Sequence, residues 1–138
     1  MAKSVRDAMT SNPRGVEART PIVEAARLLK SEDVGSLPVL EGDRLQGIVT
    51  DRDIVLKVVA ERKDPQSTTV GEIASRELVT VDPQQDLDEA LRLMARHQVR
   101  RLPVVEEDGR LVGMLAQADI AEEVKAKKAG ELLEDISK

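Results

Sequence analysis

The sequence lacks cysteine and all three aromatic residues, and His97 is its only histidine. Without cysteine, the chain has no disulfide framework, no thiolate metal site and no cysteine nucleophile. One histidine excludes a multi-histidine metal site within one chain, and the Gly-x-Ser-x-Gly motif of serine hydrolases is absent. We therefore expect no metal and no required cofactor, and an enzyme is the poorest of the candidate function classes.

The missing aromatic residues also remove the platforms on which single-stranded nucleic-acid binders stack bases. A net charge of −5 argues against general nucleic-acid binding as well. Long apolar runs are missing too, since no stretch approaches the roughly 20 apolar residues of a transmembrane helix. The first residues, MAKSVRDAM, lack the apolar run of a secretory signal, so we expect a cytoplasmic protein without a membrane partner.

The sequence contains two copies of one unit of about 60 residues. One inserted residue near Asp108-Gly109 raises the offset between the copies from 65 to 66, so that Asp53 meets Asp119. The residues that match at the offset of 65 include the pairs Val5/Val70, Val16/Val81 and Leu37-Pro38-Val39/Leu102-Pro103-Val104. With 41% hydrophobic residues, the chain has enough Leu, Val, Ile, Ala and Met for a core without aromatic side chains.

Each copy has the pattern of a β-α-β-β-α unit. Apolar residues recur at helical spacing in both copies. They are Ile22, Ala25, Ala26 and Leu29 in the first copy and Leu87, Ala90, Leu91 and Met94 in the second. We expect Thr20 as N-cap before Pro21 in the first helix, and a capping box of Asp86 with Glu89 in the second. Strands are expected at residues 16–18, 36–40, 45–50, 78–81, 102–105 and 111–116, and further helices begin near Asp51 and Gln117.

The two copies predict an α+β fold of tandem, pseudo-twofold repeats that form one module. A three-stranded sheet with helices on one side has a poor core, so we expect two such units to bury apolar faces together. The predicted boundaries are 1–62 for the first repeat with its N-terminal segment, 63–69 for the linker, 70–125 for the second repeat and 126–138 for a charged tail. That tail is interpreted either as a solvated segment or as a partner-binding helix that uses Leu132, Leu133 and Ile136.

The segment GIVTDRD leads from a predicted buried strand into the start of a helix. Thr50 and Asp53 have the spacing of a capping box, which by itself satisfies only the free N–H groups of that helix. A helix start also favours a phosphate or an oxygen-rich ligand. From the residues alone, both interpretations stay open.

The pattern VGSLPVL…LQGIVTDRDI in the first copy and VRRLPVV…LVGMLAQADI in the second resemble CBS (cystathionine-β-synthase type) repeats, and VRDAM fits the family's usual entry segment. The resemblance extends from Val5 to about Val124. Two such repeats are called a Bateman module. The resemblance implies binding of adenosine-containing ligands such as AMP, ADP or ATP, and a role as a sensor that controls another domain or protein.

In this family each cleft is built from both repeats, and the aspartate at the start of the second helix accepts hydrogen bonds from ribose hydroxyls. The resemblance implies a stronger cleft formed by Thr50, Asp53, Val79, Val99, Arg100, Arg101 and Leu102. It implies a weaker cleft formed by Val34, Gly35, Ser36, Ala116 and Asp119. The second cleft is weaker because Ala116 replaces the hydroxyl of Thr50, and a lost hydrogen bond is worth about 0.5–1.5 kcal/mol. Without aromatic residues, adenine would lie between aliphatic side chains such as Val99 and Leu102.

The charged residues near these positions allow two interpretations. Arg100 and Arg101 are either a solvated pair or a phosphate clamp, because arginine binds phosphate through two parallel hydrogen bonds. Arg52 and His97 are expected to be exposed at the surface. By helical spacing, His97 faces away from the stripe of Leu87 and Met94.

Two functions follow. The first is a nucleotide-sensing module that regulates a separate partner protein, and the alternative is a structural or oligomerisation module without a ligand. In either case we expect a homodimer, because apolar helix faces around Ile54/Val58 and Ile120/Val124 need to be covered. An adenine nucleotide is the expected ligand, and which nucleotide is bound stays open.

Overall fold

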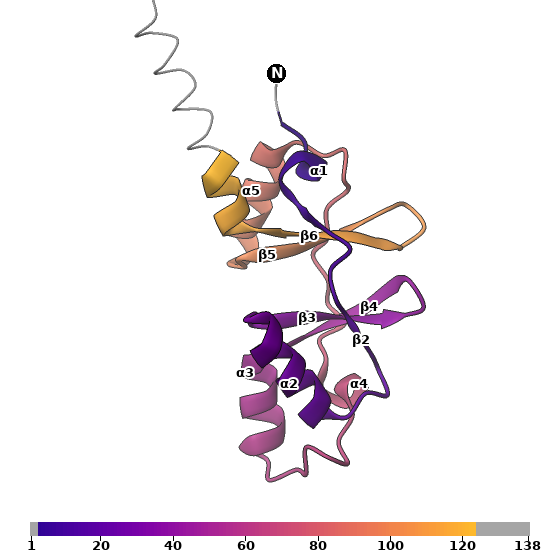
Figure 1. Cartoon of the computed structure of the whole chain (residues 1–138). Coiled ribbons are helices and arrows are strands. Elements are labelled where there is room, and N and C mark those ends of the chain that lie inside the picture. Colours follow the sequence, from indigo (N-terminus) through magenta and orange to yellow (C-terminus); the bar gives the residue numbers. More distant parts are fainter. Residues whose placement is uncertain (1–2, 124–138) are drawn as a thin grey trace, which may run out of the picture. The chain divides into compact units, whose positions relative to one another are not determined.

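The computed structural model describes residues 3–123, which form two compact units (Figure 1). Of the described residues, the first-repeat unit comprises 13–78 and 108–111, and the second-repeat unit comprises 3–12, 79–107 and 112–123. Both units combine a three-stranded sheet with helices, so the predicted α+β class is confirmed. Val124 and the predicted tail at residues 126–138 lie outside the described residues. No helix within residues 3–123 has the length and apolarity needed to cross a membrane.

The first-repeat unit has a sheet with the strand order β2-β3-β4. Strand β2 runs parallel to β3, which the connecting helix α2 allows, and β3 pairs with β4 in an antiparallel hairpin. Gly42 forms the turn with a φ of 64°, a conformation that glycine adopts without strain. The elements in chain order are β2 (Val16–Glu17), α2 (Ile22–Glu32), β3 (Ser36–Glu41), β4 (Arg44–Thr50), α3 (Asp51–Ile54), the π-helical turn η1 (Val55–Val59) and α4 (Val70–Ile73).

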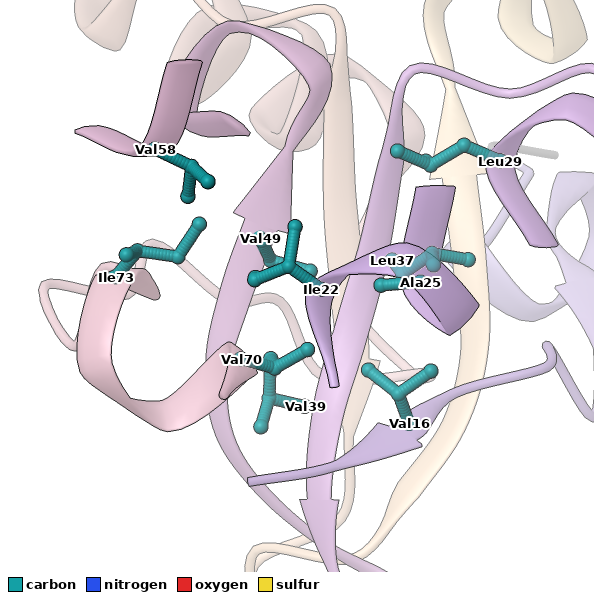
Figure 2. Close-up of a cluster of buried hydrophobic side chains, with 10 residues drawn as sticks. All are labelled: Val16, Ile22, Ala25, Leu29, Leu37, Val39, Val49, Val58, Val70 and Ile73. Atoms are coloured by element: carbon teal, nitrogen blue, oxygen red, sulfur yellow. The ribbon is translucent and has the colours of Figure 1, made fainter. Parts of the chain in front are cut away.

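The core of the first-repeat unit is entirely aliphatic and joins side chains of the sheet, α2, η1 and α4 (Figure 2). The predicted helical stripe of Ile22, Ala25 and Leu29 is buried, whereas Ala26 is only partly buried. The buried members are Val16, Ile22, Ala25, Leu29, Leu37, Val39, Val49, Val58, Val70 and Ile73.

The second-repeat unit has a sheet with the order β1-β6-β5, in which β1 pairs with β6 in antiparallel orientation. Val81 adds one parallel bridge to Val104, as Val16 does to Val39 in the first-repeat unit. The elements are α1 (Val5–Ala8), β1 (Thr10–Ser11), α5 (Leu87–His97), β5 (Arg101–Val105) and β6 (Leu111–Ala116), followed by helical residues 117–123. Its buried core consists of Val5, Val81, Leu87, Ala90, Met94, Leu102, Val104, Leu115 and Ile120.

The compact units differ from the sequence repeats because the leading segment of each repeat belongs to the unit of the other. Helix α1, which we grouped with the first repeat, packs in the second-repeat unit, where the Val5 N–H donates to the Gln85 carbonyl at 2.8 Å. Helix α4 opens the second repeat but packs in the first-repeat unit, where the Val70 N–H donates to the Thr20 carbonyl at 2.9 Å. The pairs Thr10↔Met114 and Ile48↔Ser75 continue this exchange at the sheet edges.

Three local predictions are wrong in detail. The strand expected at residues 78–81 is reduced to the single bridge at Val81. Helix α2 begins at Ile22 with Pro21 as its N-cap, while Thr20 uses its carbonyl to bind α4. Asp86 is the N-cap of α5 as predicted, but its side chain makes no capping bond and no capping box with Glu89 forms; the Leu87 N–H donates to the Lys3 carbonyl at 3.0 Å.

The outward apolar face of the first repeat also differs from the prediction. In η1 the Ala60 N–H donates to the Val55 carbonyl at 2.9 Å, five residues back, which widens the helix. Val58 is fully buried and Ile120 is 5% exposed, so neither lies on an outward face as predicted. The exposed apolar side chains are instead Val55, Leu56 and Val59, which we call the η1 patch.

Candidate functional site

Thr50 and Asp53 lie where β4 ends and α3 begins, and they form the predicted capping box. The Thr50 N–H donates to Oδ2 of Asp53 at 3.0 Å, and the Asp53 N–H donates to Oγ1 of Thr50 at 3.0 Å. The capping interpretation is therefore confirmed. These bonds fix the Asp53 carboxylate in one orientation while its side chain stays 17% exposed.

Asp53 has a further partner that the sequence analysis missed. Nζ of Lys57 lies 3.2 Å from Oδ1 of Asp53, and the same ammonium donates to the carbonyl of Ile73 at 3.0 Å. Lys57 thereby connects the start of α3 to the end of α4. The ion pair between Asp53 and Lys57 could have been predicted from the sequence, because an aspartate and a lysine four residues apart face each other on a helix.

Residues 34–36 lie beside the Thr50–Asp53 cap within the first-repeat unit. Ser36 is the strand partner of Thr50, and the Gly35 carbonyl accepts the Asp51 N–H at 2.9 Å. Asp33 ends α2 in the left-handed conformation, which turns the chain towards this position. The structure thus brings together Ser36 and Thr50, which the resemblance assigns to different clefts.

Asp119 occupies the matching position in the second-repeat unit. Its Oδ2 accepts the Ala116 N–H at 3.1 Å, but Ala116 has no hydroxyl to return the second bond of the box. The Gln117 N–H donates to the Arg100 carbonyl at 2.8 Å, as Asp51 does to Gly35. Both aspartates are therefore oriented in the same way, and only the first is held from both sides.

The other predicted site residues of the second-repeat unit differ in accessibility. Arg100 is exposed and Arg101 is half-buried, whereas Leu102 is 1% exposed and packs inside the core. The side chain of Leu102 therefore belongs to the core and is not available to lie against an adenine ring as predicted. Val79 and Val99 pack partly buried against that core. Because these residues and Asp53 belong to different units, their grouping in one cleft stays a prediction.

The structure contains cavities on each unit. One of about 320 Å³ in the second-repeat unit is lined by two predicted residues, Val99 and Arg100, together with Leu91, Met94, Ala95, Gln98 and Gln117. Another of about 530 Å³ in the first-repeat unit touches none of the predicted residues. His97 and Arg52 are exposed as predicted. Within residues 3–123, no group of three histidine or acidic side chains is arranged to hold a metal ion.

Comparison with known proteins identifies relatives along the whole chain. A family model described as "CBS domain" matches residues 5–60 and 70–126. The CBS domain-containing protein YhcV of Bacillus subtilis (strain 168) is 44% identical over 135 residues, which cover 97% of this chain and 95% of that protein.

Solved structures share the fold. Hypoxic Response Protein I with two coordinated zinc ions has a TM-score of 0.80 and 40% identity, covering 87% of this chain and 98% of that chain. The CBS domain pair of protein MJ0100, in complex with 5′-methylthioadenosine and S-adenosyl-L-methionine, has a TM-score of 0.81 and 27% identity over 92% and 99% of the two chains. CBSX2 in complex with AMP has a TM-score of 0.79 and 29% identity over 91% and 98%.

Proposed function

The chain belongs to the CBS domain family, as a pair of CBS repeats, and on this premise we propose that it binds adenosine-containing ligands as a sensor for a separate protein. It acts as a binding module in the cytoplasm and catalyses no reaction. Relatives of the same fold support this ligand class, because one is described in complex with AMP and another with 5′-methylthioadenosine and S-adenosyl-L-methionine. All three compounds carry an adenosine ribose.

The observation that carries the proposal is the matched pair of oriented carboxylates. Asp53 and Asp119 each accept one backbone N–H three residues earlier in the chain, at 3.0 and 3.1 Å. Each carboxylate is thus held in place before a ligand arrives, and a carboxylate accepts hydrogen bonds from two adjacent ribose hydroxyls at little further cost. Arg100 and Arg101 would attract the phosphate groups.

We propose that Asp53 belongs to the stronger site and Asp119 to the weaker one, because Thr50 supplies a hydroxyl that Ala116 lacks. Replacing Asp53 with Ala should cost about 1–3 kcal/mol of binding free energy, since it leaves ribose hydroxyls unpaired. That corresponds to a loss of roughly tenfold or more in affinity. Asp119→Ala should cost less, and calorimetric titration with AMP and ATP measures both.

Asp51→Ala is the matched control, because its exposed carboxylate accepts only the neighbouring Arg52 N–H, at 2.7 Å, among residues 3–123. Thermal unfolding of each variant separates loss of the cap from loss of the ligand. Equal losses for Asp53→Ala and Asp119→Ala, or a larger loss for Asp119→Ala, would refute the ranking. A wild-type protein that binds no adenosine compound would refute the proposed function itself.

The second candidate function is a structural or oligomerisation module without a ligand. It is favoured by Lys57 and Thr50, which already occupy both oxygens of Asp53, and by the exposed η1 patch. The two functions are separated by an absorbance spectrum of the purified protein. Without Trp or Tyr the protein scarcely absorbs in the near ultraviolet, so a co-purified adenine nucleotide shows its own maximum once nucleic acid is excluded.

We also propose a homodimer, in which the η1 patch of one protomer meets the same patch of its partner. Val55, Leu56 and Val59 are 56%, 47% and 65% exposed, and a twofold contact covers both copies with one self-complementary surface. This surface replaces the predicted face at Ile54/Val58, because Val58 is buried in the core.

A further inference from the structure

Lys57 distinguishes the surroundings of Asp53 from those of Asp119. Its ammonium lies 3.2 Å from Oδ1 of Asp53 and is held at 3.0 Å by the carbonyl of Ile73. The lysine side chain is 49% exposed, so its charge is partly desolvated and is fixed from two sides. The carboxylate and the ammonium together carry no net charge.

The second repeat has the opposite charge at this position. With the offset of 66 that relates Asp53 to Asp119, Lys57 matches Glu123. Glu123 makes an ion pair with Lys3 at 3.6 Å, and its side chain is 30% exposed. Asp119 is thus followed, one helical turn later, by a second acid where Asp53 is followed by a base.

This difference matters for a ligand that carries phosphate. A carboxylate that binds the ribose hydroxyls repels a phosphate on the same ribose, because the two groups lie within one Debye length, about 8 Å at physiological salt. Lys57 offsets this repulsion without touching the phosphate. Glu123 and its partner Lys3 carry no net charge together, so the charge of Asp119 is left uncompensated by them, whereas Lys57 compensates that of Asp53.

Resting on the proposed binding of adenosine compounds, we propose that Lys57 and Glu123 determine ligand class. Lys57 makes the Asp53 site select adenosine phosphates, and Glu123 makes the Asp119 site select adenosine compounds that carry no phosphate. Lys57 is a positioning and specificity residue here, since it acts through Asp53 and through its charge. The ligands described for relatives include both classes. One relative is described with AMP, which carries a phosphate, and another with 5′-methylthioadenosine and S-adenosyl-L-methionine, which carry none.

The test uses the ratio of two affinities in a chain with one intact site. In an Asp119→Asn background, ATP and adenosine are titrated by calorimetry against chains with Lys57, Lys57→Met and Lys57→Arg. Lys57→Met should lower the affinity for ATP by roughly fivefold while changing that for adenosine by less than about twofold. Lys57→Arg should restore the ratio, and added salt should reduce the difference between Lys57 and Lys57→Met.

A purely structural role of Lys57 would alter both affinities by the same factor, and that result would overturn the inference. Lys30→Met is the control for net charge, because Lys30 is an exposed lysine of the same unit. It should leave the ratio of ATP affinity to adenosine affinity close to that of the chain with Lys57. Should Lys57→Met prove too unstable, Lys57→Gln removes the charge and keeps a hydrogen-bond donor on a side chain that is one bond shorter.

The reciprocal experiment uses an Asp53→Asn background. Glu123→Gln should raise the affinity for ATP relative to adenosine by roughly threefold, and an unchanged ratio would overturn the assignment of the Asp119 site. Failure of the proposed function is a separate result, because then neither ATP nor adenosine binds the wild-type chain.

Discussion

Two exposed carboxylates, Asp7 and Glu72, cap the helices that open the two repeats. Oδ2 of Asp7 accepts the Ser4 N–H at 3.0 Å, and Oε2 of Glu72 accepts the Thr69 N–H at 2.6 Å. These backbone bonds hold the pKa of each carboxyl below its ordinary value. A second bond, from the hydroxyl of Ser4 or Thr69, lowers the pKa further but by less. A carboxyl with a lowered pKa stabilises the fold above its ordinary pKa, and this contribution is lost as the pH falls through the lowered value.

We therefore expect Glu72→Gln to lower the unfolding temperature near pH 7, and the gap to wild type to close as the pH falls through the lowered pKa of Glu72. Glutamine still accepts a bond from Thr69, so the gap reports the charge. Circular dichroism follows the unfolding, since the chain has no aromatic fluorophore. Glu77→Gln, at an exposed position, is the control. A gap that stays constant as the pH falls would contradict the assignment.

At the scale of the elements, the exchanged segments depend on close backbone approach at one glycine in each sheet. Ile48 and Ser75 exchange two backbone hydrogen bonds, at 3.0 and 2.9 Å, and a Cβ added at Gly47 would lie 2.7 Å from the Ser75 carbonyl oxygen. Gly113 has the matching role, because a Cβ there would meet the side chain of Met9 and, at 3.1 Å, the Thr10 carbonyl oxygen. A side chain at Gly47 therefore pushes the docked Ser75 backbone away, whereas at Gly113 the flexible Met9 side chain can move aside and the Thr10 backbone has to give only slightly.

Gly47→Ala should therefore destabilise the protein by about 1–3 kcal/mol, the usual cost of forcing extra atoms into a packed site. Urea unfolding followed by circular dichroism measures the effect. Gly35→Ala is the matched control, because its Cβ would lie 3.4 Å from the nearest atom, Oδ2 of Asp51, and needs no backbone shift. Similar losses for the two variants would show that docking of the Ser75 segment does not depend on Gly47.

At the scale of the whole molecule, the η1 patch predicts the oligomeric state. Leu56→Glu places a charge in the centre of an apolar contact, where a buried unpaired carboxylate is costly. We expect sedimentation of the wild type above the monomer mass of 15.1 kDa at micromolar concentration, and of Leu56→Glu at that mass. Leu91→Glu is the control, because Leu91 is the exposed large apolar residue of α5. A wild type that sediments as a monomer contradicts the proposed dimer.

Much of the fold could be predicted from local patterns. The two hairpins and the apolar stripes of α2 and α5 follow from periodicity, since a helix or strand of that spacing has one face to bury. The capping box of Thr50 and Asp53 is equally local, because both partners lie within one helical turn. The burial of Val58 could not be predicted in this way. Ile54 and Val58 share one helix face as the spacing predicts, but tertiary packing turns that face towards the core of the first-repeat unit.

The sequence by itself determined that this protein has two repeats, which residues match between them, and that a carboxylate begins a helix in each. These properties depend on order along the chain and need no distant contact. Only the tertiary structure decided that α1 and α4 pack in the unit of the other repeat, that Leu102 is buried in the core and that Lys57 also donates to the Ile73 carbonyl. Such contacts form between segments far apart in sequence. Local patterns fit several arrangements of these segments equally well, and packing and hydrogen bonding in the folded protein select one of them.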